Sequence, residues 1–359
     1  MIITNLRLNN FKNFEEKTFE LGGVINAFVG NNGVGKTNVL DAVYMLAFGK
    51  SYFNLKLNQI IRHGAGFFSV KGHFLKDNID EIITVSYRKG EKKIIARNDK
   101  PYEKLSEHIG LIPVVMISPY DRDLISEGSE VRRKFTDKLI SQFDKNYLLD
   151  LTSYYQTLSQ RNSLLKYFAL NNVFDEETLS VYDEKLHRYG HRIFDKRKQF
   201  VEAFRPYLLR KYAWLSREAE VPGLIYRSHL FDKPLKELLL ENRKKDAVLQ
   251  YTSAGIHRDD LVFELNGYPV RKFGSQGQQK SFLIALKLAE YEMLKSRKNE
   301  APILLFDDIF DKLDALRVEQ IIKWVEEKQF GQVLITDTHP ERIEKLLRSI
   351  DGETKIFRL

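Results

Sequence analysis

The residues whose types and spacing best suit chemistry lie near the N-terminus, where positions 30 to 37 read GNNGVGKT. This is the pattern G-x-x-x-x-G-K-[ST], in which glycines let successive backbone N–H groups surround phosphate oxygens. The lysine reaches the β- and γ-phosphates of a nucleoside triphosphate, and the hydroxyl binds Mg²⁺. We predict a catalytic role for Lys36, a metal-binding role for Thr37, and phosphate binding by the whole loop: Gly30, Asn31, Asn32, Gly33, Val34, Gly35, Lys36, Thr37 and Asn38.

A second candidate is a pair of carboxylates at the end of an apolar run, in the segment ILLFDD that starts at Ile303. Ligands of open α/β sheets gather at the carboxyl ends of the strands, and a P-loop needs an acidic residue there to hold its metal. We assign Asp307 to Mg²⁺ and Asp308 to orienting or deprotonating the attacking water. The alternative is an acidic loop after a core strand, with no chemical role.

A third candidate is the polar stretch SQGQQ, which precedes a predicted helix whose apolar residues share one stripe. Taken alone it is only a helix start. Placed between a P-loop and ILLFDD, it resembles the S-G-G-Q signature of ABC-type ATPases, in which a serine hydroxyl, a glycine amide and a helix N-terminus form a second anion site. In that architecture the site faces the γ-phosphate held by another subunit, so ATP joins a homodimer. The residues concerned are Ser275, Gln276, Gly277 and Gln278.

The same resemblance assigns two further loops. Asp311, Leu313 and Asp314 fall where such ATPases carry the D-loop, which crosses the dimer interface. His339 lies near the place of the switch histidine that touches the γ-phosphate, although a lone loop histidine is equally compatible with an ordinary surface residue.

These residues need a sheet and helices to position them, and the chain offers both. An apolar run from Val24 to Val29 predicts the strand before the P-loop, and Thr37 to Phe48 has helical spacing. We expect an α/β fold, an ABC-type ATPase head with a mixed sheet, interrupted by an inserted, mostly helical lobe. The predicted parts are residues 1–130 (first part of the head), 131–250 (helical lobe) and 251–359 (rest of the head). The helical lobe lacks the sustained heptads of a long coiled coil.

A basic stretch lies within the predicted helical lobe. From Lys185 to Arg217 there are ten Lys or Arg against two acidic residues, a local excess of eight that equals the net charge of +8 of the whole chain. Clustered cations favour a DNA phosphate backbone as partner, but a solvated helix face that only aids solubility is the alternative. The DNA-binding candidates are Lys185, Arg188, Arg192, Lys196, Arg197 and Lys198.

Composition limits the class of protein. The 359 residues contain no cysteine, which excludes disulfides and cysteine-ligated zinc and favours a cytoplasmic location. No apolar run is long enough to span a membrane, and the N-terminus lacks the apolar core of a signal peptide, so we expect no membrane association.

Together the motifs resemble the RecF family of bacterial DNA replication and repair proteins over essentially the whole chain. The segments that carry the resemblance are GNNGVGKTN, SPYDRDLISEGSEVRRKFTD, YYQTLSQRNSLLK, YDEKLHRYG, AGIHRDDLVF, FGSQGQQKSFLIALKLAE and ILLFDDIFDKLD. The resemblance implies ATP-dependent dimerisation and binding to gapped DNA or to junctions of duplex and single strand. It also implies cooperation with RecO and RecR in loading the RecA recombinase.

Some positions depart from the patterns. Transporter ATPases carry Glu where this chain has Asp308, which is one methylene shorter, so slow hydrolysis is predicted. No glutamine occupies the loop around residues 117–121, where Asp121 is a candidate metal sensor, and residues 51–54 (SYFN) fall where many RecF sequences have an arginine.

Two pairs of charged residues have more than one interpretation. Arg258 and Asp259 are compatible with an interface or DNA element and with a loop ion pair, and Arg132 and Arg133 pose the same question.

A nucleotide-binding subunit of a transporter is the alternative function, since it shares the P-loop and signature chemistry.

Overall fold

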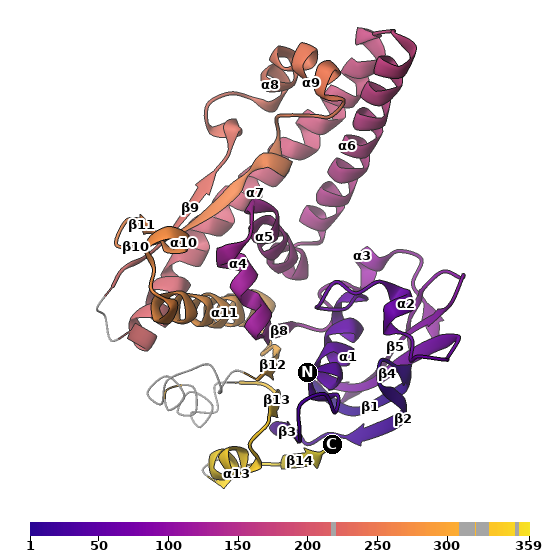
Figure 1. The fold of residues 1–359 in the computed structure, drawn as a ribbon, viewed down its shortest axis with the longest axis vertical. Helices are drawn as coiled ribbons and strands as arrows, with labels where there is room; N and C mark the ends of the chain where they lie inside the picture. Colours follow the sequence, from indigo (N-terminus) through magenta and orange to yellow (C-terminus); the bar gives the residue numbers. More distant parts are fainter. Residues whose placement is uncertain (217–219, 309–319, 321–329, 349–351) are drawn as a thin grey trace. The chain divides into compact units, whose positions relative to one another are not determined.

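The computed structural model describes residues 1–216, 220–308, 320, 330–348 and 352–359. The chain forms two compact units, Met1–Asp121 with Glu290–Leu359, and Arg122–Ala289 (Figure 1). The second unit is thus wider at both ends than the predicted range 131–250. Hydrogen bonding explains the difference on the C-terminal side, because strand β10 (Asp260–Leu265) pairs with β9 (Pro222–Arg227) inside this unit. The signature segment accordingly belongs to the second unit.

The first unit contains a five-stranded parallel sheet in the order β14-β3-β13-β12-β8. Its three central strands are buried at every position, as expected of parallel strands covered on both faces. The strands are β3 (Ile25–Val29), β8 (Val114–Ile117), β12 (Ile303–Asp307), β13 (Val333–Asp337) and β14 (Thr354–Arg358).

A second sheet of this unit is antiparallel, in the order β2-β1-β4-β5-β6-β7. Buried and less buried residues alternate along β4, so one face of that strand is in the core. The strands are β1 (Ile2–Phe11), β2 (Phe14–Glu20), β4 (Phe67–Lys76), β5 (Ile79–Arg88), β6 (Ile94–Arg97) and β7 (Lys100–Pro101).

Helix α1 (Lys36–Phe48) joins the two sheets into one core. It contacts strands of both sheets, and its side chains are buried on nearly every side. A helix that is apolar all round needs such a central position. The shorter helices of the unit are α2 (Leu57–Ile60), α3 (Leu105–His108) and α13 (Pro340–Arg348), with a 3₁₀ turn η1 (Pro119–Arg122) at its boundary.

The second unit is mostly helical, as predicted, and its largest elements are α6 (Lys145–Asn171) and α7 (Glu176–Ser216), which lie side by side (Figure 1). A three-stranded sheet β11-β10-β9 accompanies them. The remaining elements are α4 (Asp123–Ser126), α5 (Ser129–Phe143), η2 (His229–Phe231), α8 (Leu235–Glu241), α9 (Arg243–Leu249), η3 (Ile256–Arg258), β11 (Tyr268–Pro269), α10 (Val270–Phe273) and α11 (Gln276–Lys298), of which α11 continues into the first unit.

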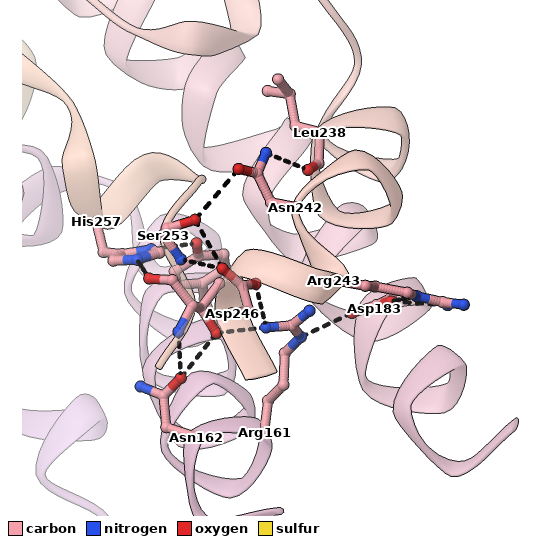
Figure 2. Close-up of polar contacts among 11 residues, drawn as sticks. Arg161, Asn162, Asp183, Leu238, Asn242, Arg243, Asp246, Ser253 and His257 are labelled. Carbon is pink, nitrogen blue, oxygen red and sulfur yellow. Dashed lines mark hydrogen bonds and ion pairs between the residues drawn. The ribbon is translucent and has the colours of Figure 1, made fainter. Parts of the chain in front are cut away.

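A buried arginine holds α6, α7 and α9 together. Arg161 is fully buried, and its guanidinium donates to Asp183 at 2.7 Å, to Asp246 at 2.8 Å and to Thr252 at 2.8 Å (Figure 2). Asn162 accepts from the backbone and hydroxyl of Thr252 beside it. Part of the segment YYQTLSQRNSLLK, one of those that carry the family resemblance, therefore belongs to the packing of this unit.

Within the described residues, no helix is both long enough and apolar enough to cross a membrane.

Candidate functional site

The P-loop connects the buried strand β3 directly to helix α1, in the order that the sequence predicts. Gly33 and Gly35 have φ angles of 86° and 108°, which residues with a side chain rarely adopt. A Cβ at Gly35 would also lie 2.5 Å from the side chain of Asn13. The glycines therefore permit the tight loop that joins β3 to α1.

Lys36 is buried and folds back over this loop. Its Nζ donates to the backbone carbonyls of Gly30 at 2.7 Å and Asn31 at 2.9 Å. The ammonium group is therefore held against the backbone of the loop that is predicted to surround the phosphates.

The predicted metal ligands lie next to each other. Thr37 Oγ1 donates to Asp307 Oδ1 at 2.7 Å. The register of the parallel sheet brings two further hydroxyl groups to Asp307, because Asp307 is level with Thr336 of β13, and Phe306 is level with Ile117, the last residue of β8. Thr336 Oγ1 lies 3.0 Å from Asp307 Oδ1, and Ser118 Oγ lies 3.2 Å from Oδ2. Three hydroxyl groups thus surround one carboxylate.

Burial raises the pKa of Asp307 above its usual value, against the opposite effect of its hydroxyl donors. No group of three His, Cys, Asp or Glu residues suited to a metal occurs among the described residues. Mg²⁺ does not need one, since it commonly uses one or two carboxylates together with substrate phosphates and water. A buried, incompletely neutralised Asp307 beside the Thr37 hydroxyl fits that mode of binding.

Asp308 directly follows β12 and has a left-handed backbone with φ of 48°. Its N–H donates to Thr336 Oγ1 at 3.0 Å, which places it at the same edge of the sheet as Asp307. His339 follows β13; its N–H donates to Asp337 Oδ1 at 2.7 Å, while its side chain is 61% exposed. The predicted D-loop residues Asp311, Leu313 and Asp314 lie outside the described residues.

The signature segment forms the N-terminus of α11. Ser275 Oγ accepts from the N–H of Gln278 at 3.2 Å, and Gln278 Oε1 accepts from the N–H of Ser275 at 2.6 Å, which is a capping box. Ser275 and Gln276 are exposed. The apolar stripe that the sequence predicted, from Phe282 to Met293, is buried. The helix start thus carries an exposed serine hydroxyl that caps the first turn.

Comparisons with known proteins agree with this geometry. Residues 2–355 match the family described as RecF/RecN/SMC N terminal domain. Proteins named DNA replication and repair protein RecF are similar over the whole chain: that of Flavobacterium johnsoniae is 54% identical, covering 100% of both chains, and that of Phocaeicola vulgatus is 44% identical, covering 99% of this chain and 96% of the relative. The chain belongs to the RecF family.

Solved structures support the assignment. The recombination mediator protein RecF-ATPrS in the RecFOR pathway superposes with a TM-score of 0.89 at 31% identity, covering 100% of this chain and 96% of the other. The corresponding RecF-ATP structure gives 0.88 at 32% identity over 94% and 92%. An Smc head domain from Pyrococcus furiosus, at 18% identity and a TM-score of 0.57, shares the fold. The predicted ABC-type head is confirmed. So is the prediction of a DNA replication and repair protein, in preference to a transporter subunit.

The basic helix of this RecF-family chain is α7, and one predicted DNA contact on it is wrong. Arg197 is buried, and its guanidinium donates to Asp137 at 2.9 Å and Asp259 at 2.8 Å. It occupies the inward stripe of α7, four residues after buried Ile193 and three before buried Phe200. This helical spacing from apolar residues marks Arg197 as inward-facing, which a count of charges along the chain does not show.

The other five candidates on α7 are exposed: Lys185, Arg188, Arg192, Lys196 and Lys198. Arg192 and Lys196 pair with acidic residues of the α5–α6 region, Asp150 at 3.4 Å and Asp144 at 2.7 Å. Exposed pairs of this kind contribute little and exchange readily for other anions. The helix therefore keeps a basic surface, smaller than the sequence count suggested.

In the cluster from His257 to Asp260, the buried side chains form contacts that stabilise the fold. Asp259 pairs with Arg197, and Tyr226 donates to it at 2.6 Å, so the loop ion pair with Arg258 is not formed. Arg132 binds Asp260 through two hydrogen bonds, at 2.8 and 3.1 Å. Arg133 donates to the carbonyl of Asp259 at 2.6 Å. Arg258, which is exposed, lies over the ring of Tyr251.

Sequence reasoning missed several residues at the nucleotide site. Ser118 and Thr336 each stand at the carboxyl end of a buried strand, and this position was a usable signal. Asn13, in the turn between β1 and β2, donates to the carbonyl of Val34 at 2.8 Å and accepts from Asn38 at 2.7 Å. Nothing local in the sequence marks Asn13, because it reaches the P-loop only through sheet pairing.

Proposed function

We propose that the chain binds Mg-ATP at the P-loop, and the contact between Thr37 and Asp307 carries this proposal. Backbone N–H groups of the loop and Lys36 bind the phosphates, while Thr37 and Asp307 hold the metal. Mg²⁺ supplies charge neutralisation to the β- and γ-phosphates when bound. The RecF structures with ATP and ATPrS support nucleotide binding at this fold.

The proposed hydrolysis is slow. Asp308 orients the attacking water from the strand end beside Asp307, and its short side chain holds that water less closely than a glutamate would. His339, exposed beside β13, is the proposed γ-phosphate switch. The proposed rate of ATP hydrolysis depends on bound DNA, since a basic surface and an ATP site occur in one chain.

The proposed consequence of ATP binding is a homodimer. Ser275, Gln276, Gly277 and Gln278 of one copy contact the γ-phosphate held by the P-loop of the other, and the D-loop residues Asp311, Leu313 and Asp314 cross the same interface. The exposed, capped start of α11 supports this role, because a helix N-terminus with an accessible hydroxyl attracts an anion.

The proposed ligand of the dimer is gapped DNA or a junction of duplex and single strand. The exposed cations of α7 supply phosphate contacts. RecO and RecR are the proposed partners, and loading of RecA the proposed outcome, on the strength of the family and of the RecFOR pathway named for the solved relatives. The proposed compartment is the cytoplasm.

Size measurement tests the composite site. The full chain is sized by light scattering without nucleotide, with ATP, and with ATP and gapped DNA. We expect ATP to increase the dimer fraction, and gapped DNA to increase it further. A chain that remains monomeric at every concentration in all three conditions contradicts the proposal.

Filter binding with duplex DNA at rising salt tests the basic surface. Each phosphate contact adds about −0.9 to the slope of log K against log salt, so five cations give a slope of no more than about −4.5. Replacing Lys185 and Arg188 by Gln should reduce the slope by about two. Lys134→Gln is the control, because it removes an exposed charge of α5 that is already paired with Glu130. An equal effect of the control would show that only net charge matters.

A further inference from the structure

The segment Ser51–Asn54, which differs from the arginine-containing pattern of many RecF sequences, is anchored to the P-loop helix. Asp41 of α1 is fully buried. Its carboxylate accepts from the N–H of Tyr52 at 2.7 Å and from the hydroxyl of Ser51 at 2.7 Å. Lys12 lies 2.7 Å from the same carboxylate. A buried anion with these donors fixes the backbone of the segment relative to α1.

The other end of Tyr52 reaches the strand-end turn after β8. Its phenol donates to Asp121 Oδ1 at 2.5 Å, and Asp121 Oδ2 accepts from the N–H of Ser118 at 2.8 Å. Burial and the Asp121 charge raise the pKa of Tyr52 well above its usual value, so the phenol stays a donor at physiological pH. The ring is fixed by edge-on contact with Tyr44, at a centroid distance of 5.0 Å.

Ser118 completes a closed circuit of contacts. Its hydroxyl donates to Asp307 Oδ2 at 3.2 Å, and Thr37 of α1 donates to Asp307 Oδ1 at 2.7 Å. The path thus leaves α1 at Asp41, passes through Tyr52 and the Ser118 turn to Asp307, and returns to α1 at Thr37. Asp121, which the sequence suggested as a metal sensor, contacts Tyr52 and Ser118 within this circuit.

We propose that Tyr52 is a positioning residue of the metal site: it links the P-loop helix to the Ser118 turn and thereby sets the orientation of the Asp307 carboxylate relative to Thr37. Outer-shell hydrogen bonds orient metal ligands, and their loss typically costs about 10- to 100-fold in metal affinity. Tyr52 acts through Asp121 and lies two residues further out than Ser118, so the effect should fall at or below the low end of that range. The inference rests on the proposed Mg-ATP site.

The test measures binding of a fluorescent ATP analogue to the full chain while Mg²⁺ is titrated, and again in EDTA. Tyr52→Phe removes only the phenolic oxygen. We expect it to raise the Mg²⁺ concentration for half-maximal binding by about threefold to tenfold, with analogue affinity in EDTA unchanged. A merely structural defect would lower both affinities together.

Tyr120→Phe is the matched control, because it removes the same group from a neighbouring ring that is 62% exposed. Its Mg²⁺ titration should match that of the unmodified chain. Ser118→Ala provides the second variant. If Tyr52 acts through Ser118, the double variant should need no higher Mg²⁺ concentration for half-maximal binding than Ser118→Ala alone.

The outcomes separate the two proposals. An unmodified chain whose binding ignores Mg²⁺ overturns the proposed metal site. A chain that responds to Mg²⁺, with Tyr52→Phe responding identically, overturns only the role of Tyr52. Fully additive effects of Tyr52→Phe and Ser118→Ala also overturn it, since they would place the two residues on separate paths.

Discussion

Two buried charges of this RecF-family chain, one in each unit, are neutralised to different degrees. In the first unit, Asp307 is buried among hydroxyl groups, and burial raises its pKa. In the second unit, buried Arg161 is matched by the carboxylates of Asp183 and Asp246. A charge left without a full counter-charge is available to a cation that arrives with a ligand, whereas a matched pair is committed to the fold. The comparison teaches that buried charge marks a binding site only where its neutralisation is incomplete.

The largest expected effect comes from removing the incompletely neutralised charge. Asp307→Asn should lower ATP hydrolysis by at least about a hundredfold, because the metal site loses its carboxylate. The melting temperature without nucleotide should not fall, since a costly buried charge disappears. Phosphate-release assays and thermal melts measure the two quantities. A strongly destabilised Asp307→Asn chain would mean that Asp307 is structural, like the arginines of the second unit.

Removing Arg161, in contrast, should lower the stability of the fold. Arg161→Met leaves Asp183 and Asp246 buried without their cation and should cost about 3–5 kcal/mol in the free energy of unfolding. Urea denaturation measures this cost. Arg192→Met is the control, because its pair with Asp150 is 60% exposed on the arginine side, and it should cost less than about 1 kcal/mol. Equal losses of unfolding free energy in Arg161→Met and Arg192→Met would show that the buried network stabilises the fold no more than an exposed ion pair does.

Ser275 is a residue of the second unit that is proposed to bind a ligand, in contrast to the structural residue Arg161. Ser275→Arg should leave ATP binding to the monomer intact and should weaken the ATP-induced dimer by about a hundredfold or more, because a bulky side chain fills the anion site. Equilibrium sedimentation with ATP measures the dimer. Ser163→Arg, which makes the same change at an exposed serine of α6, should dimerise normally. Normal dimerisation of Ser275→Arg would reject the composite site.

The smallest expected effect concerns pH. Burial lowers the pKa of His257 from 6.5 to about 4, and its ring lies 2.9 Å from the Tyr154 hydroxyl and 3.0 Å from the Thr252 carbonyl. Between pH 6.5 and 4 the unfolded chain binds a proton that the folded chain does not, so stability falls as pH falls, by at most about 1.4 kcal/mol per unit.

Urea denaturation at several pH values checks this dependence. His257→Gln should be less stable at pH 7 but should lose less stability between pH 6.5 and pH 5, because glutamine does not titrate. An unchanged pH dependence in His257→Gln would assign the effect to other groups.

Prediction from sequence worked best where function depends on neighbouring residues in the chain. The P-loop, the strand before it and the helix after it were placed within one residue of their observed bounds. Asp307 is predicted at a strand end, and it is the last residue of β12, 2.7 Å from the Thr37 hydroxyl. The fold class and family followed from such motifs, whereas the roles assigned to individual residues remain predictions.

The sequence by itself determined which segments form the P-loop, the acidic strand end and the capped signature helix, because local backbone geometry and hydrophobic periodicity are encoded within a few residues. Only the tertiary structure decided that Arg197 is buried, that Asp259 pairs with it, and that Tyr52 links Asp41 to Asp121. The physical reason is that a charged or polar side chain has no preferred partner of its own. Its role depends on which groups from distant segments share its surroundings after folding.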